Sequence, residues 1–314
     1  MIDFATARQR LEAKDRSPRD KRMSAQEAAE LVQDNQTVAI GGCLYSRTPM
    51  AVLRQVIRRR PRGLTLVRNL SCYETELFMV AGSADQLMTS WMGIGLPWGI
   101  SPILRSYVES GRLRYQEWSH LALGLRLRAA AMGISFLPST SMLGSDLMRT
   151  SGAKTMICPY TGHPLCLVPA LFPDVAIVHV HRADIYGNAQ IDGYPHMDVD
   201  MAGAATTVIL STEEIVDTEE IRRTASSTAI PFFAVDAVVE ARFGSFPHEC
   251  FGLYDADMEH IGSYAESVRA RGAEAVLAYL DRFVFEPTSH QEYLDRVGLD
   301  RLEACRRRVP ELMS

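Results

Sequence analysis

The segment from Gly41 to Pro49 combines residue types that could bind an anionic ligand. Paired glycines leave the backbone open to close approach, and a helix that starts at Thr48-Pro49 would present an anion-attracting N-terminus. The guanidinium of Arg47 could hold a carboxylate through two parallel hydrogen bonds. A tight turn with a surface arginine is the alternative interpretation, because short glycine motifs are common. The candidate substrate-binding residues of this loop are Gly41, Gly42, Ser46 and Arg47.

The tetrapeptide Glu117-Trp118-Ser119-His120 is a second candidate for chemistry. His120 could act as an acid or base near neutral pH, and Ser119 could cap the following helix. A catalytic Ser-His pair is disfavoured, because adjacent side chains rarely face each other and no third orienting group is evident. We therefore take Glu117, Ser119 and His120 as candidate catalytic residues. The alternatives are a helix cap for Ser119 and a place in the pocket wall for His120.

Two further polar residues are candidates for substrate binding. Glu74 follows an expected strand and could contact substrate or partner, or could be a helix-start acid favoured by the helix dipole. Asn188 follows a glycine and could donate to substrate or hold its own turn. His179 and His181 would point the same way from a strand, a spacing that suits a metal edge. Because no third ligand is marked, we expect a core or pocket-wall role for both histidines and no metal.

Alternating strands and helices must position these residues. Apolar runs predict strands at 37–40, 64–67, 86–91, 113–116, 155–158, 175–181, 208–210 and 232–239. Caps and periodic apolar faces predict helices at 24–33, 77–81, 100–109 and 121–132, and another from Thr48. Such alternation predicts an α/β fold class, with an open, mainly parallel sheet and helices on both faces. We expect residues 1–22 to be a polar N-terminal leader and residues 23–314 a single domain, with a helical appendage from about residue 257.

Composition excludes several classes of protein. The 314 residues include 33 basic and 38 acidic side chains, and a net charge of −5 argues against a nucleic-acid partner. No stretch approaches the roughly 20 apolar residues of a membrane span, so no membrane partner is expected. The six cysteines form no C-x-x-C pair, which argues against a zinc ribbon or thioredoxin-type site. These features favour a cytoplasmic protein.

The stretch from Asp34 to Cys43, with Pro49 beyond it, resembles the signature of the A (alpha) chains of class I coenzyme A transferases. That signature has an Asp, a small turn residue, two variable positions, three apolar residues, Gly-Gly-Phe and a Pro six residues later. This chain departs from it at Cys43, where Phe is usual, and at Arg47, where many members have Gly. The residues from Gly41 onward are similar to the glutaconate CoA-transferase branch, in which Arg-Thr-Pro is common. Further segments agree with that branch, namely 117–120, 136–138, 142–147, 158–162 and 173–191.

The resemblance implies a CoA-transferase-like fold and a complex of an A and a B subunit. In this family a Glu attacks an acyl-CoA thioester, which gives an anhydride and then a glutamyl-CoA thioester. That Glu belongs to the B subunit, within a short turn such as Glu-Asn-Gly, and this chain contains no Glu-Asn-Gly. We therefore expect an A (alpha) subunit that moves CoA between an acyl-CoA and a carboxylic or dicarboxylic acid. Coenzyme A would enter as a substrate, and the B (beta) subunit would be the partner.

Two other functions stay open. The same scaffold could act as a hydrolase or a decarboxylase of a CoA thioester, because fold does not fix reaction. A structural or ligand-sensing subunit is the alternative without catalysis. A related branch hydrolyses a ring carbon–carbon bond, and in our alignment it has a catalytic Glu at the position of His120 and an Arg near Thr140. This chain has neither residue, which argues against ring hydrolysis.

Overall fold

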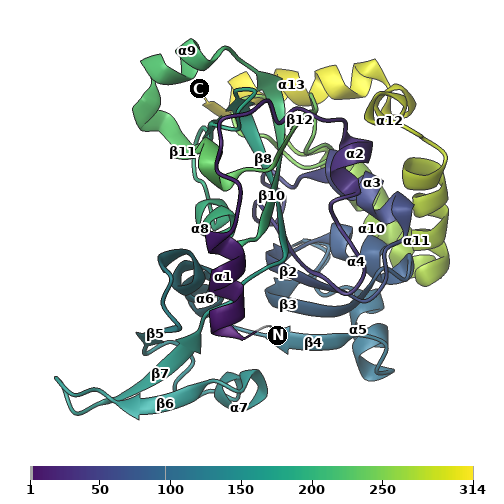
Figure 1. Ribbon diagram of the computed structural model, residues 1–314. Coiled ribbons are helices and arrows are strands. Elements are labelled where there is room, and N and C mark those ends of the chain that lie inside the picture. Colours follow the sequence, from purple (N-terminus) through teal and green to yellow (C-terminus); the bar gives the residue numbers. More distant parts are fainter. Residues whose placement is uncertain (1–2, 96, 314) are drawn as a thin grey trace.

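The central sheet is built from apolar runs that the sequence predicts as strands (Figure 1). The computed structural model describes residues 3–95 and 97–313. Parallel strands lie side by side in the order β4 (Arg114–Glu117), β3 (Ala84–Met92), β2 (Leu64–Ser71), β1 (Thr37–Ile40), β8 (Val175–Ala183), β10 (Thr207–Ile215) and β12 (Ala237–Glu240). Two short antiparallel strands extend the sheet at the carboxyl end of β8, namely β9 (Ala189–Gln190) and β11 (Thr228–Ile230). The expected open, mainly parallel sheet is confirmed.

The order of the strands reverses at β1. Strands β2, β3 and β4 follow on one side of β1, and β8, β10 and β12 follow on its other side. The chain leaves β1 for one face of the sheet and leaves β8 for helix α8 on the opposite face. Loops that diverge in this way open a crevice at the carboxyl ends of the two strands, where open α/β sheets bind ligands. The Gly41 loop lies at this position.

Side chains alternate between two cores, one on each face of the sheet. In β1, Val38 and Ile40 join one core while Ala39 joins the other, as the two-residue period of a strand requires. The first core is covered by α2 (Ala25–Ala29), α3 (Met50–Arg59), α4 (Tyr73–Val80), α5 (Pro102–Glu109), α10 (Met258–Arg271) and α11 (Ala273–Leu280). The second is covered by α6 (His120–Met132) and α8 (Asp198–Ala204). The expected helices on both faces are therefore present.

Local sequence explains where several helices begin and end. Ser24 and Glu27 form the predicted capping box at the start of α2. Helix α6 starts at the Ser119 cap and ends at Gly133, which adopts the left-handed conformation. The start of α3 differs from expectation, since Pro49 is the N-cap and no side chain caps the helix. Thr48 is not the cap, because its hydroxyl bonds to groups outside the helix.

A small antiparallel sheet projects from the body beside α6 (Figure 1). It has the strand order β5 (Phe136–Ser139), β7 (Pro164–Pro169) and β6 (Lys154–Ile157), with α7 (Leu147–Ser151) between β5 and β6 in the chain. Only the β6 region was expected as a strand. The expected strand over 232–239 is partly wrong, because residues 232–234 form a 3-10 turn and β12 begins only at Ala237.

The chain is helical beyond residue 257, as expected. After α11 come a π-helical turn (Asp281–Phe285), α12 (His290–Val297) and α13 (Leu299–Met313). Helix α9 (Thr218–Arg223) follows β10. At the other end, α1 (Phe4–Glu12) packs on the domain through buried Ala7 and Leu11. None of the described helices has both the length and the apolar character needed to cross a bilayer.

Candidate functional site

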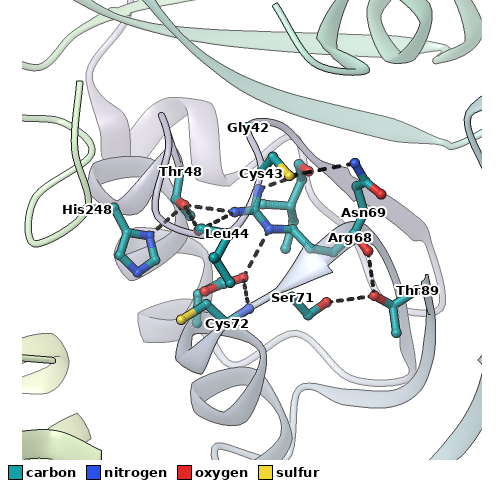
Figure 2. Close-up of polar contacts among 12 residues, drawn as sticks. Gly42, Cys43, Leu44, Thr48, Arg68, Asn69, Ser71, Cys72, Thr89 and His248 are labelled. Carbon is teal, nitrogen blue, oxygen red and sulfur yellow. Dashed lines mark hydrogen bonds and ion pairs between the residues drawn. The ribbon is translucent and has the colours of Figure 1, made fainter. Parts of the chain in front are cut away.

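Cys43, Asn69 and His120 meet at the carboxyl edge of the sheet. The amide nitrogen of Asn69 donates to His120 Nε2 at 3.3 Å. It also lies 3.8 Å from Cys43 Sγ (Figure 2). Ser90 Oγ donates to the Asn69 backbone carbonyl at 2.8 Å and also lies 3.2 Å from Asn69 Oδ1, so the oxygen of the amide faces Ser90 and its NH2 faces the histidine and the thiol. His120 is exposed at the first position of α6. We call Cys43, Asn69 and His120 the edge cluster.

The edge cluster offers an exposed imidazole beside an oriented amide donor. His120 Nε2 accepts from Asn69, so in the neutral ring the proton is on Nδ1 and the lone pair of Nε2 is engaged by the amide. Burial raises the pKa of the Cys43 thiol, so it stays protonated at neutral pH. Sequence reasoning named His120 but missed Asn69. The signal that could have found Asn69 is a polar residue near the end of an apolar strand.

A second histidine, His196, lies near the edge cluster. Burial lowers the pKa of His196 to about 4, and the charges of Arg47, Arg68 and His120 act in the same direction. His196 is therefore neutral around pH 7. Its ring makes an edge contact with exposed Tyr194, with centroids 5.2 Å apart. His196 therefore adds a neutral imidazole to the surroundings of the Arg47 and Asp198 charges that act on it.

Arg47 is buried and does not face solvent. It is 1% exposed, and its Nη1 donates to Asp198 Oδ2 at 2.6 Å and to the His179 carbonyl at 3.0 Å. Its Nη2 donates to the Tyr194 carbonyl at 2.9 Å. Asp198 Oδ1 accepts from the backbone N–H of Gly42 at 2.7 Å. Arg47 precedes α3 and Asp198 begins α8, so this ion pair ties together the two segments that flank the crevice.

The two glycines are required by close packing. A Cβ at Gly41 would lie 3.1 Å from both Asp198 Oδ1 and the Ile177 carbonyl oxygen. Gly42 has φ +73°, and a Cβ there would collide with the Ser46 carbonyl. Cys43 and Ser46 close the loop through backbone hydrogen bonds of 3.0 and 2.9 Å. The loop is therefore a rigid turn on which the Cys43 side chain is presented.

Arg68 is a buried hub beneath the loop (Figure 2). Its guanidinium donates to Glu74 Oε1 at 3.0 Å, to Thr48 Oγ1 at 2.8 Å and to the Leu44 carbonyl at 3.1 Å. It also donates to the carbonyl of Gly41. Glu74 does begin a helix, α4, but it is fully buried rather than solvated. Sequence reasoning missed Arg68, although an arginine directly after an apolar run was the available signal.

The other predicted catalytic residues have separate environments. Ser119 Oγ accepts from the Ala122 N–H at 3.1 Å and caps α6, and it also bonds to Ser141 Oγ. Glu117 is exposed at the end of β4 and lines a surface cavity with Tyr115 and Trp91. Ser119 is thus the sequence neighbour of His120 in the edge cluster, whereas Glu117 lines a separate cavity on the surface.

Asn188 holds its own turn. Its side chain donates to Asp184 Oδ2 at 2.8 Å and accepts from the Phe232 N–H at 3.1 Å. It lines a cavity with Pro18 and Tyr186, apart from the Gly41 loop. These contacts match the structural role considered for Asn188, which is to hold its own turn.

His179 and His181 are both engaged with protein groups. His179 bonds to Ser211 Oγ and to Glu213 Oε1, each at 2.8 Å. His181 bonds to the Phe251 carbonyl at 2.8 Å and accepts from the Asp192 N–H at 3.1 Å. All four ring nitrogens therefore have partners.

One Glu-x-Gly triplet occurs in the chain, at Glu109-Ser110-Gly111. It ends helix α5 on the surface, where Gly111 has φ +72°. The triplet is a helix C-terminus and not a turn at the carboxyl end of a strand. Glu249 bonds to the Ser46 side chain, and burial raises the pKa of its carboxyl. Two other acidic side chains beside the loop, Asp198 and Glu74, are each paired with a buried arginine. Neither is presented as a nucleophile.

The family model described as Coenzyme A transferase matches residues 22–241. An uncharacterized protein of Archaeoglobus fulgidus is 42% identical over 297 residues, which make up 94% of this chain and 66% of that protein. The chain thus spans about two thirds of the length of this relative. The A subunit of glutaconate CoA-transferase from Acidaminococcus fermentans is 30% identical over 291 residues, with 87% of this chain and 90% of that protein covered.

Two crystal structures share the fold. Glutaconate coenzyme A-transferase of Acidaminococcus fermentans matches with a TM-score of 0.86 at 30% identity, covering 90% of this chain and 94% of that chain. The decarboxylase AibA/AibB matches with a TM-score of 0.73 at 32% identity, covering 83% and 98%. The two relatives differ in reaction, so the residues at the site must decide the chemistry.

Proposed function

This chain belongs to the class I coenzyme A transferase family as an A-type chain, and from that premise we propose that it forms a heteromeric CoA-transferase with a B subunit. The enzyme would move CoA between an acyl-CoA and a carboxylic or dicarboxylic acid. Its nucleophilic Glu would lie on the B subunit. The observation that carries this proposal is the match to glutaconate coenzyme A-transferase over 90% of this chain.

The site supports a role for this chain as half of a shared active site. The edge cluster supplies an exposed imidazole and an amide donor. The nearby carboxylates Asp198 and Glu74 are held by Arg47 and Arg68. A catalytic carboxylate from a partner would complete this set of groups, and that is the division of labour we propose.

The proposed reaction assigns defined roles to the residues of this chain. The partner's Glu attacks the thioester carbonyl, the carbon–sulfur bond breaks, and CoA leaves as a thiolate while a mixed anhydride forms. The thiolate then attacks the glutamyl carbonyl, which releases the free acid and leaves a glutamyl-CoA thioester. The acceptor carboxylate takes up CoA by the reverse of these two steps, and the carboxylate of the Glu is regenerated. Asn69 would donate to the carbonyl oxygen as its negative charge develops. His120 would hold or supply a proton at the acid group, and the Arg47–Asp198 pair would keep the loop in place.

Co-expression with the neighbouring reading frame tests the proposal. The purified complex should exchange CoA between acetyl-CoA and glutaconate or similar acids, and hydroxylamine should cleave the glutamyl-CoA thioester on the partner, which releases CoA and leaves a glutamyl hydroxamate. Exchange by this chain purified alone would refute the assignment of the nucleophile to a partner. Release of free CoA without any acceptor acid would indicate a hydrolase, and loss of CO2 from the acyl group would indicate a decarboxylase.

A further inference from the structure

A buried cluster of Cys72, Glu74 and His248 lies beneath the Gly41 loop. Each residue offers one potential ligand atom, and these atoms all lie within 4.8 Å of one another. All three side chains are fully buried. Cys72 and Glu74 come from the start of α4, and His248 comes from a distant loop, so the fold brings the three together.

Thr48 bonds to Nδ1 of His248 (Figure 2). Thr48 Oγ1 accepts from Arg68 at 2.8 Å, and its single proton can go either to the Leu44 carbonyl at 3.3 Å or to His248 Nδ1 at 2.6 Å. In the tautomer with the proton on Nδ1, His248 Nε2 presents a lone pair. Within the described residues, this buried Nε2 has no hydrogen-bond partner.

Glu74 presents a second unmatched acceptor. Its Oε1 accepts from Arg68 Nε at 3.0 Å and from the Cys72 N–H at 2.9 Å. Its Oε2 is buried and has no partner among residues 3–95 and 97–313. Two buried polar atoms without partners, Glu74 Oε2 and His248 Nε2, carry a substantial free-energy penalty. A species that accepts lone pairs from both atoms would remove this penalty.

We propose that Cys72, Glu74 and His248 bind a Zn²⁺ ion. Thiolate, carboxylate and imidazole form a mixed ligand set that suits zinc. Binding would break the Cys72 S–H bond, form a zinc–sulfur bond and release the proton to solvent. The Ile94 carbonyl, 3.2 Å from Cys72 Sγ, or a water would take the fourth position. Thr48 and Arg68 already orient the imidazole and the carboxylate, as supporting groups do in zinc sites.

A second cluster of the same three residue types contains a carboxylate whose oxygens already accept hydrogen bonds from the protein. His179, Glu213 and Cys250 also have ligand atoms within 4.8 Å of one another. There, Glu213 accepts from His179 at 2.8 Å and from Tyr254 at 2.6 Å, and it also accepts from two backbone N–H groups. Its acceptor capacity is used by the protein. The proposal therefore applies to the first cluster only, and the second provides a matched control.

Metal analysis of the full chain tests the proposal. After dialysis against EDTA removes bound metal, the chain should take up about one Zn²⁺ per molecule, measured by inductively coupled plasma mass spectrometry. The Co²⁺-loaded chain should show thiolate-to-cobalt absorption. Cys72→Ser and His248→Gln should abolish uptake, and Thr48→Val should weaken it roughly 10- to 100-fold. Cys250→Ser should bind zinc like the wild type.

Two results would overturn the proposal. The first is a folded wild-type chain that binds neither Zn²⁺ nor Co²⁺, which would mean that a proton or a water bridges the two acceptors. The second is retention of metal by Cys72→Ser together with its loss in Cys250→Ser. Because a ligand variant can fail to fold, the cobalt spectrum of the wild-type chain is the deciding measurement. None of these measurements depends on transferase activity.

Discussion

At the scale of single residues, the Arg47–Asp198 pair determines the shape of the candidate site. Both side chains are almost completely buried, so neither can exchange its partner for water. Asp198 also receives the Gly42 N–H, and Arg47 also binds two carbonyls. Removal of either charge would leave the other unpaired in the interior, which is far more costly than loss of a surface pair.

Asp198→Asn is therefore expected to lower the free energy of unfolding by roughly 3 to 5 kcal/mol. Urea denaturation followed by circular dichroism would measure this change. Asp192→Asn is the matched control, because Asp192 pairs with Arg182 at the same 2.6 Å distance but both side chains are partly exposed. The control should cost less than about 1 kcal/mol. Equal losses of unfolding free energy in the two variants would contradict the stabilising role of the buried Arg47–Asp198 pair.

His120 is the residue on which the proposed chemistry depends most. In the complex with the B subunit, His120→Gln should lower kcat by roughly 10²- to 10⁴-fold, because a positioned acid or base contributes about this factor. KM should change little, since Gln can still bond to the Asn69 amide. His163→Gln on the projecting sheet is the control, because His163 is exposed there. Unchanged kcat in His120→Gln would remove His120 from the mechanism.

At the scale of elements, the start of α6 separates two interpretations of Ser119. Its hydroxyl caps the helix, so Ser119→Ala should cost about 1 kcal/mol of stability, and Ser119→Asp should restore it. Ser106→Ala, at an exposed position of α5, should change stability by less than about 0.5 kcal/mol. Thermal denaturation would measure these effects. A large loss of kcat in the stable Ser119→Asp variant would instead indicate a catalytic hydroxyl.

The elements that the sequence predicts well are those with a strong local signal. Buried strands such as β1 and β8, and the capped helices α2 and α6, are recognisable from apolar runs and caps within a few residues. The small antiparallel sheet was largely missed because β5 and β7 are short and contain prolines. Such strands lack the alternation that marks a half-buried strand.

The candidate site was predicted less completely, and the reason is physical. Its loop was recognisable, but the partners that define it come from distant parts of the chain. Arg47 and Asp198 are 151 residues apart, and Asn69 and His120 are 51 apart. Local pattern predicted Arg47 as a substrate-binding residue, with a surface arginine as the alternative, because neither a buried site nor a counter-ion is visible from the loop itself. Arg47 reaches its buried counter-ion, Asp198, only because the strand order places β8 beside β1.

At the scale of the whole molecule, the helical C-terminal part adds buried titratable groups to the core. His260 of α10 packs against Tyr279 of α11, and its Nε2 bonds to the Tyr279 hydroxyl at 2.9 Å. Burial lowers the pKa of His260 to about 4, against 6.5 for the unperturbed group. Between these values the unfolded chain binds a proton that the folded chain does not bind. Stability linked to His260 is therefore complete above pH 6.5 and is lost as the pH falls toward 4.

Acid should consequently loosen the packing of this helical part on the domain. At pH 5 the His260 linkage alone should lower the free energy of unfolding by about 1 to 2 kcal/mol relative to pH 8. The measurement is urea denaturation of the wild type and of His260→Gln at both pH values. Because Gln does not titrate, the variant should show a smaller loss between pH 8 and pH 5, even if it is less stable at both. If the two proteins lose the same amount, His260 already binds its proton in the folded state, and the interface between α10 and α11 is more hydrated than its contacts imply.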